Sequence, residues 1–209
     1  VNFLLSKDVK IIIFGCNTAT AVAMSTIRKE IPLQIIGVVQ SGALAAARTT
    51  ETKNVAVIGT KATVDSHSYL KEIQYRDPEI KVSEFAQPKL APLAEEDPDE
   101  DIKNAVVSES LTPLKNADYD TLVLGCTHYP LLREEIVAVV GQDKKIVDPA
   151  DQVAQYTYNV LRRDDLFAES TAPVKHDYYT TGEAKKFTEI TRQWMNDDTI
   201  IGHHVDAED

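Results

Sequence analysis

Short apolar runs alternate with longer helix-like stretches through most of the sequence, and this alternation most constrains the fold. The apolar runs are rich in β-branched residues and are bounded by glycine or polar residues; they are Val9–Phe14, Ile35–Val39, Val55–Ile58, Thr121–Leu124 and Lys145–Val147. Unbroken apolar strands are typical of parallel sheets that are covered on both faces. The helix-like stretches between them are Ala19–Glu30, Val64–Tyr75, Glu100–Lys115, Leu131–Val140 and Ala150–Arg162. We therefore expect an α/β doubly wound architecture.

The charge balance narrows the possible partners. The chain carries 22 basic and 33 acidic residues, a net charge of −11. Nucleic acid and anionic membranes both require a cationic face, so we expect neither as a partner. A small anionic substrate is compatible with this charge, because backbone amides at a helix N-terminus can bind it. The sequence has no signal peptide and no apolar run long enough to span a bilayer, and we expect a cytoplasmic protein with free thiols.

The only two cysteines, Cys16 and Cys126, occupy the same place in two similar segments. In each segment an apolar strand runs into glycine, then cysteine, then two polar residues and a predicted helix. Ligands bind at the carboxyl ends of strands in open α/β sheets. We expect Gly15 and Gly125 to allow a sharp turn and a close approach of the ligand. We also expect the helix N-termini to lower the pKa of both thiols toward the reactive thiolate.

Two matched thiols suit a reaction that inverts a stereocentre. One thiolate removes a proton from a carbon atom while the other thiol delivers a proton to the opposite face. A disulfide oxidoreductase would normally place its cysteines close together in the sequence, and a single-nucleophile enzyme would leave the second cysteine unexplained. The sequence has no Walker-type phosphate loop, no dinucleotide-binding glycine motif and no His-Glu-x-x-His zinc motif. We therefore expect no cofactor and no metal.

The two cysteine segments resemble those of the glutamate racemases, within the aspartate/glutamate racemase superfamily. The matching motifs are Gly-Cys-Asn-Thr-Ala-Thr at residues 15–20 and Leu-Gly-Cys-Thr-His-Tyr-Pro at residues 124–130. The likeness continues at residues 36–40, 57–60 and 180–182, so it covers nearly the whole chain. It implies cofactor-independent racemisation of glutamate, which would supply D-glutamate for bacterial peptidoglycan.

The resemblance also implies roles for individual residues. Cys16 would act on D-glutamate and Cys126 on L-glutamate, and His128 would assist proton transfer at Cys126. The residues expected to bind the substrate are Asn17, Thr18, Thr60, Thr63, Thr127 and His128. Thr60 and Thr63 resemble hydroxyls that hold a substrate carboxylate, although an ordinary helix N-cap is an equally good interpretation of either threonine from the sequence. Glu95 aligns loosely with an acidic residue near the family's site.

The family fold implies two similar α/β domains with the active site in the cleft between them. Residues 1–40 and 149–209 would form the first domain and residues 41–148 the second, and a homodimer is compatible with the family. The family begins with an Asp-Ser-Gly strand motif and a Tyr-Gly pair, and neither occurs before Cys16. We therefore expect one or two βα units, roughly 30 residues or more each, to be missing from an N-terminally truncated first domain. Poor or no turnover by the 209-residue chain would follow.

Three alternatives stay open from the sequence. A racemase acting on aspartate or another amino acid would share the two-thiol layout and differ in pocket length. A thiol redox protein would need the two cysteine Cα atoms within roughly 7 Å of each other. A protein that binds the amino acid without catalysis would show no exchange of the Cα proton.

Overall fold

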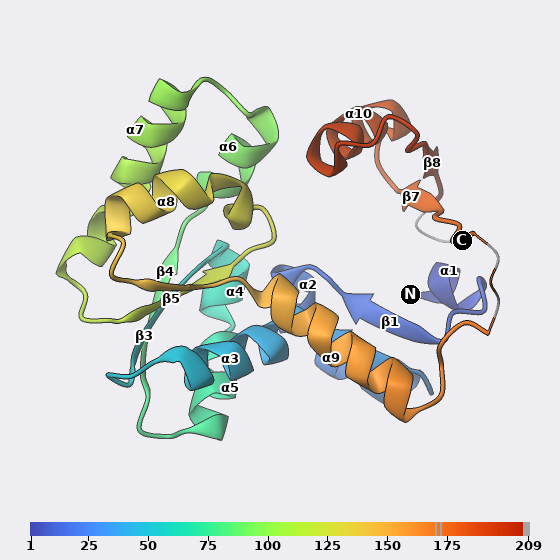
Figure 1. Cartoon of the computed structure of the whole chain (residues 1–209), viewed down its shortest axis with the longest axis horizontal. Helices are drawn as coiled ribbons and strands as arrows, with labels where there is room; N and C mark the ends of the chain where they lie inside the picture. Colours follow the sequence, from blue (N-terminus) through green and yellow to red (C-terminus); the bar gives the residue numbers. More distant parts are fainter. Residues whose placement is uncertain (170, 172, 207–209) are drawn as a thin grey trace. The chain divides into compact units, whose positions relative to one another are not determined.

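The computed structural model of the chain describes residues 1–169, 171 and 173–206 (Figure 1). The strands are β1 (Ile11–Phe14), β2 (Gln34–Gly37), β3 (Asn54–Gly59), β4 (Lys81–Ala86), β5 (Thr121–Gly125), β6 (Lys145–Val147), β7 (Tyr178–Thr180) and β8 (Gly202–His204). The α-helices are α1 (Asn2–Leu5), α2 (Asn17–Glu30), α3 (Val38–Thr49), α4 (Lys61–Asp65), α5 (Ser68–Arg76), α6 (Leu90–Glu96), α7 (Glu100–Ser110), α8 (Arg133–Val140), α9 (Pro149–Arg163) and α10 (Ala184–Met195). Two short 3-10 helices are η1 (Thr112–Asn116) and η2 (Tyr129–Leu132).

Every sheet in the described part of the chain is parallel. Strands β1 and β2 form one sheet, β7 and β8 another, and the largest sheet has the order β4-β3-β5-β6. In this largest sheet Val57 of β3 lies opposite Val123 of β5. The predicted α/β class with parallel sheets is confirmed.

The chain divides into two compact units, residues 11–166 and residues 1–10 with 167–209. The smaller unit contains α1, β7, α10 and β8. Within it the rings of Phe3 and Tyr179 meet edge to face with centroids 4.9 Å apart, and the Lys7 ammonium lies 4.9 Å from the Phe3 centroid. Every predicted catalytic and substrate-binding residue belongs to the larger unit.

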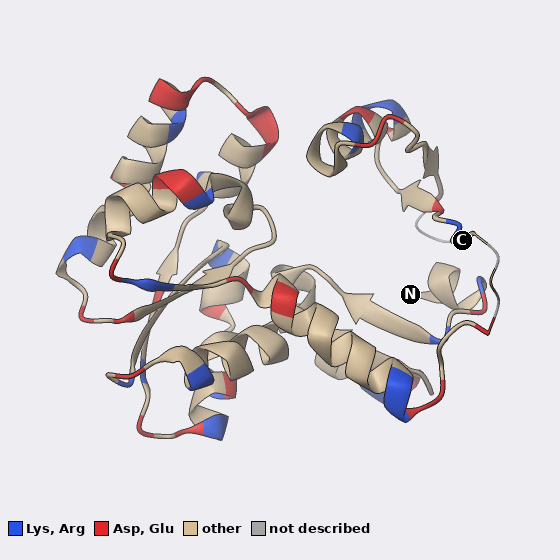
Figure 2. Cartoon of the chain, in the orientation of Figure 1, with Lys and Arg blue, Asp and Glu red and all other residues tan. Residues whose placement is uncertain are grey.

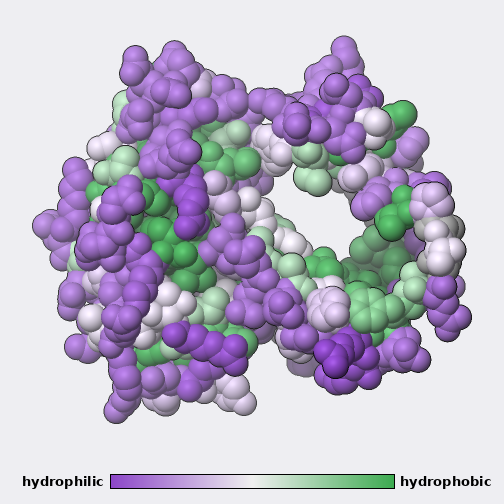
Figure 3. All heavy atoms as spheres, in the orientation of Figure 1, coloured by the Kyte–Doolittle hydropathy of each residue, from purple (hydrophilic) through white to green (hydrophobic). Residues whose placement is uncertain are grey.

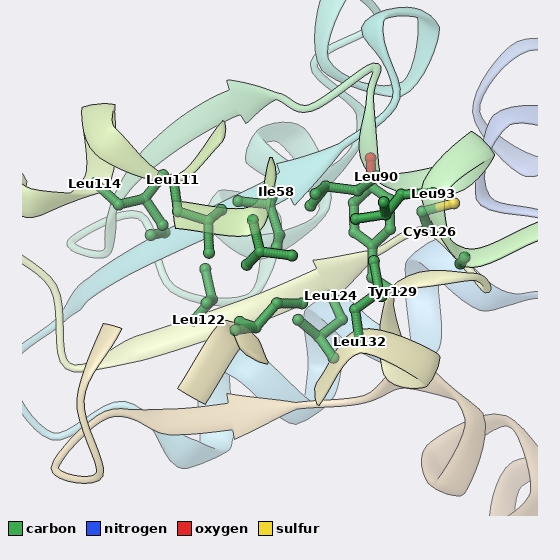
Figure 4. Packing of buried hydrophobic residues seen from close by; sticks show 14 of the residues in the cluster. Ile58, Leu90, Leu93, Leu111, Leu114, Leu122, Leu124, Cys126, Tyr129 and Leu132 are labelled. Carbon is green, nitrogen blue, oxygen red and sulfur yellow. The ribbon is translucent and has the colours of Figure 1, made fainter. Parts of the chain in front are cut away.

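Buried side chains cover both faces of the four-stranded sheet. Because side chains alternate along a strand, Leu122 and Leu124 point into one cluster while Val123 points into the other. Helices α6, α7 and α8 contribute to the first cluster, and α3 and α5 to the second. Figure 4 shows the first cluster, with Cys126 at one end of it. This double coverage explains why these strands read as unbroken apolar runs.

Several elements differ from the sequence-based prediction. The run Ile35–Val39 was expected to be a strand throughout, but the strand ends at Gly37 and α3 begins at Val38. The expected helix Val64–Tyr75 is broken at His67, whose φ of 53° is left-handed. Strand β4 was not predicted, because it lies at the edge of the sheet and its residues are exposed or only half-buried.

Helix α9 begins directly after β6 and has favourable charges at both ends. The Asp148 carboxylate caps the helix by accepting a hydrogen bond from the Ala150 N–H at 2.9 Å. Asp151 lies in its first turn, and Arg162 and Arg163 lie in its last turn, as the red and blue ends of α9 in Figure 2 show. None of the described helices, α9 included, combines the length and the apolar character that crossing a bilayer requires.

Candidate active site

The two cysteines follow the carboxyl ends of two strands in the larger unit. Cys16 comes two residues after β1 and is the N-cap of α2, where its sulfur accepts a hydrogen bond from the Ala19 N–H at 3.5 Å. Cys126 follows β5 directly. The side chain of Cys16 is exposed and that of Cys126 is buried, and both are free thiols. The two equivalent sequence positions therefore place their sulfur atoms in different surroundings.

The electrostatic surroundings of Cys126 differ from the sequence-based expectation. Burial raises the pKa of the Cys126 thiol, and the backbone N–H groups of His128 and Tyr129 offset only part of this effect. Negative charge on Cys16 and on Glu95 raises this pKa further. The expected lowering of the pKa by a helix N-terminus is therefore wrong for Cys126. The segment after it is the four-residue η2, and α8 begins only at Arg133.

The backbone turns before the two cysteines do not require glycine. Neither Gly15 nor Gly125 has a positive φ, so neither is needed for a left-handed turn. A Cβ atom on Gly125 would lie 2.7 Å from the backbone oxygen of Ile58 and 3.2 Å from Cε2 of Tyr69. A Cβ atom on Gly15 would meet nothing within 4 Å. Gly125 is thus required for close packing of β5 against β3, whereas Gly15 borders open space.

His128 lies between Cys126 and a carboxylate. Its Nδ1 is 3.7 Å from the Cys126 sulfur, and its Nε2 is 3.1 Å from Oε1 of Glu95 in α6. The imidazole is half-buried, with 26% of its side chain exposed. An imidazole in contact with both a thiol and a carboxylate can accept a proton on one ring nitrogen and donate one from the other.

Three threonine hydroxyls form a triangle, and one of them belongs to Thr18, two residues after Cys16. The Thr18 Oγ1 lies 2.8 Å from that of Thr60 and 3.3 Å from that of Thr63, and the last two are 3.1 Å apart. Thr60 is also the N-cap of α4, because its Oγ1 accepts from the Thr63 N–H at 3.3 Å. The helix-cap interpretation of Thr60 is thus correct, and the triangle adds hydroxyl groups that can reorient to donate to an anion.

A pocket of about 710 Å³ is lined by Cys126 and by Gly15 and Asn17, the neighbours of Cys16. Its lining also includes Thr127 and apolar residues of α9, such as Val153 and Leu161. In Figure 3 green and pale residues are visible along β1, while α9 shows both pale and purple residues. The pocket lies wholly within the larger unit.

The predicted site residues thus fall into two groups around this pocket. Asn17, Cys126 and Thr127 line it directly, whereas Cys16 does not, although its neighbour Gly15 does. His128 contacts the lining residue Cys126, and Thr18, Thr60 and Thr63 contact one another. Sequence reasoning did not identify Tyr69, whose hydroxyl contacts Asn17. Among residues 1–169, 171 and 173–206, no three His, Cys, Asp or Glu side chains are grouped so as to bind a metal ion.

The parallel α/β fold and the two thiols at strand ends agree with the sequence comparisons. A family profile described as Asp/Glu/Hydantoin racemase matches residues 1–157, and the chain belongs to this family. Over all 209 residues it is 97% identical to the glutamate racemase of Lactobacillus johnsonii and covers 79% of that protein. The crystal structure of a glutamate racemase isoform from Bacillus anthracis matches with a TM-score of 0.93 at 34% identity, covering 99% of this chain and 77% of that one.

A second similar structure contains D-glutamate. It is the glutamate racemase of Francisella tularensis in complex with D-glutamate, which matches with a TM-score of 0.89 at 27% identity over 98% of this chain and 76% of that one.

Proposed function

We propose that this chain is a glutamate racemase that interconverts L- and D-glutamate with Cys16 and Cys126 as its two bases. The names of the similar proteins support glutamate as the substrate. The observation that carries the mechanism is geometric. Cys16 and Cys126 each follow the carboxyl end of a parallel strand, and Gly15 beside Cys16 lines the same pocket as Cys126. A two-base inversion requires two such groups that can approach one carbon atom from opposite faces.

The reaction balances without a cofactor. For L-glutamate the Cys126 thiolate takes the Cα proton and becomes a thiol, leaving a carbanion at Cα. The Cys16 thiol then gives its proton to the opposite face of the same carbon and becomes a thiolate. The D-isomer reverses the roles. Because the Cα proton is far less acidic than a thiol, groups around the pocket must stabilise the developing negative charge.

The other predicted residues supply binding and proton transfer in this proposal. His128 assists proton transfer at Cys126, since it contacts that sulfur and also contacts Glu95. Asn17, Thr18 and Thr127 bind the substrate by hydrogen bonds from side chains and backbone. Thr60 and Thr63 hold a carboxylate, which is consistent with their hydroxyl triangle with Thr18.

The biological setting is part of the same proposal. D-glutamate made by this reaction would supply bacterial peptidoglycan synthesis in the cytoplasm, and the enzyme would act as a homodimer. The predicted domains, residues 1–40 with 149–209 and residues 41–148, would place one cysteine in each. Cys16 follows a strand of the β1-β2 sheet and Cys126 follows a strand of the separate β4-β3-β5-β6 sheet, which is consistent with this division.

Deuterium incorporation tests the mechanism directly. The chain is incubated with L-glutamate in heavy water, and the two isomers are separated and analysed by mass spectrometry. A two-base enzyme gives D-glutamate carrying deuterium at Cα while the recovered L-glutamate is initially unlabelled. Long incubations make the measurement sensitive to slow turnover. Equal early labelling of both isomers would contradict a two-base mechanism.

Serine variants and a second substrate complete the test. Cys16→Ser and Cys126→Ser should each reduce racemisation in both directions by several orders of magnitude, because a hydroxyl is a poor acid and base near neutral pH.

Faster inversion of aspartate than of glutamate would favour the aspartate racemase alternative. Binding of glutamate without any exchange would indicate a binding protein. A mild oxidant that joins Cys16 to Cys126 reversibly would favour the redox alternative.

A further inference from the structure

Tyr69 is a buried tyrosine of α5 that contacts the active site through one hydrogen bond. Its hydroxyl donates to Oδ1 of Asn17 at 2.7 Å, across 52 positions of sequence. Tyr69 is fully buried and Asn17 is 3% exposed, so water does not compete strongly for this bond. A buried polar pair of this kind is costly to break, because each partner would be left without a hydrogen bond.

The bond determines which end of the Asn17 side chain is available to a ligand. A carboxamide has one accepting end, Oδ1, and one donating end, Nδ2. Because Tyr69 occupies Oδ1, the donating end remains for the pocket that Asn17 lines. Burial raises the pKa of the Tyr69 hydroxyl, and negative charge on Asp148 and Cys126 raises it further. Tyr69 therefore keeps its proton, and it does not become a phenolate that would attract Nδ2 instead.

The position of the hydroxyl requires a glycine at residue 42. A Cβ atom on Gly42 of α3 would lie 2.9 Å from the Tyr69 hydroxyl oxygen and 2.9 Å from Cγ of Pro149. The absence of a side chain at residue 42 thus leaves the space that the hydroxyl occupies. Gly42 of α3 therefore leaves room for the hydroxyl in the position from which it reaches Asn17.

We propose that Tyr69 is a positioning residue, which holds the Asn17 carboxamide with its N–H₂ group toward the pocket so that it donates to a carboxylate of the substrate. This inference rests on the proposed function and extends it to a residue that never touches the substrate. It predicts that the Tyr69 hydroxyl matters for substrate binding more than for the proton transfers at the cysteines.

The main test compares Tyr69→Phe with Tyr119→Phe in the full chain. Tyr119 is also buried, at 5% exposed, and lines a different pocket, so it controls for the loss of a buried phenol. Side-chain N–H₂ signals of Asn17 are followed by NMR, and glutamate affinity is measured by calorimetry. Tyr69→Phe should move the Asn17 signals and weaken glutamate binding about three- to tenfold, the equivalent of one net hydrogen bond. Tyr119→Phe should do neither.

A second variant isolates the donating role of Asn17. Asn17→Asp keeps an oxygen that accepts from Tyr69 but loses the N–H₂ group, so it should weaken glutamate binding at least as much as Tyr69→Phe. Where turnover is measurable, Tyr69→Phe should raise KM and leave kcat within about twofold. Its effect should be the same from pH 6 to pH 9, because the hydroxyl does not titrate there.

Several results would overturn the proposal. Tyr69→Phe that binds glutamate as tightly as Tyr119→Phe would reduce Tyr69 to a packing residue. Glutamate that leaves the Asn17 N–H₂ signals of the unmodified chain unmoved would exclude the donor role without requiring any variant to fold. If the unmodified chain does not bind glutamate at all, the proposed function fails. The Asn17 signals in Tyr69→Phe then still decide whether Tyr69 holds the carboxamide.

Discussion

The surroundings of Cys126 show how a single side chain acquires its chemistry. Its sulfur is buried, faces the His128 imidazole, and is influenced by negative charge on Cys16 and Glu95. Burial disfavours the thiolate most, and each nearby negative charge disfavours it further. The position directly after a strand was visible in the sequence, but the direction of the pKa shift depends on atoms that only the fold brings together.

Removing the neighbouring charges should lower the pKa of Cys126. In Cys16→Ser the Cys126 thiol should ionise at a lower pH than it does in the unmodified chain, because the negative charge on Cys16 is absent. The double variant Cys16→Ser/Glu95→Gln should ionise lower again, since the second charge is also gone. The measurement is the pH dependence of alkylation of the single thiol by iodoacetamide. An alkylation profile that moves to higher pH in either variant would refute the electrostatic account.

The residues of the site differ in how far the sequence could reveal them. Cys16, Asn17, Cys126 and His128 lie within two short motifs, so the sequence placed them together. Tyr69 could not be found in this way, because only tertiary packing brings it to Asn17. A lone tyrosine in an amphipathic helix is ordinarily a core residue, and its hydroxyl partner is not encoded locally.

At the level of elements, the two glycines that precede the cysteines differ in the space available for a side chain. The Cβ of an alanine at residue 125 would lie 2.7 Å from the backbone oxygen of Ile58, and backbone cannot move aside easily. An alanine at residue 15 would enter open space. The same motif position is therefore a packing requirement in β5 and a feature of the pocket after β1.

This difference predicts unequal effects on stability. Gly125→Ala should lower the free energy of unfolding by about 1–3 kcal/mol, the usual cost of overpacking a core. Gly15→Ala should change it by less than about 0.5 kcal/mol, as at other open sites. Urea denaturation followed by circular dichroism measures both. Equal losses of stability in the two variants would show that the close contact at residue 125 is relieved by movement of the strand.

The sequence predicted most elements of the larger unit because their periodicity is strong. Strands β3 and β5 are buried on both faces and read as continuous apolar runs. Strand β4 lacks this signal, since its exposed residues include Lys81 and Ser83. Helix α3 begins at Val38 with no intervening loop, so the apolar residues of β2 and α3 merged into one apparent strand.

At the scale of the whole molecule, Asp120 ties the start of β5 to the loop that leads into β3. Its carboxylate accepts from the Thr50 hydroxyl at 2.7 Å, the Glu51 N–H at 2.6 Å and the Thr52 N–H at 2.8 Å. Burial alone would raise the pKa of Asp120, but these hydrogen bonds together lower it well below its ordinary value. Contacts across about 70 positions of sequence thus depend on one ionised carboxylate.

The pH dependence of the free energy of unfolding should reveal the contribution of these Asp120 hydrogen bonds. A carboxyl whose pKa is lowered by folding stabilises the fold above its unfolded pKa of about 4, and this contribution is lost as the pH falls toward the folded value. Asp120→Asn should therefore be less stable than the unmodified chain at pH 7, by about 1–2 kcal/mol. The difference should shrink between pH 5 and pH 2. Urea titrations at several pH values measure it, and a constant difference would argue against an ionised Asp120.

Sequence patterns alone predicted the fold class of the chain, but they did not predict its division into domains. The predicted domain boundaries near residues 40 and 149 came from the family resemblance, and they stay a prediction. The structure groups residues 11–166 into one compact unit. Periodicity identifies strands and helices locally, but it does not say which of them share a core, because that depends on contacts between distant segments.

The unequal exposure of the two sulfurs has a consequence for covalent inhibition. An electrophile arriving from solvent meets the exposed Cys16 well before the buried Cys126. In the proposed mechanism each catalytic cycle uses both sulfurs. An adduct at Cys16 alone would therefore abolish racemisation of both the L- and the D-isomer. Compounds aimed at this protein would therefore need to reach only the accessible member of the pair.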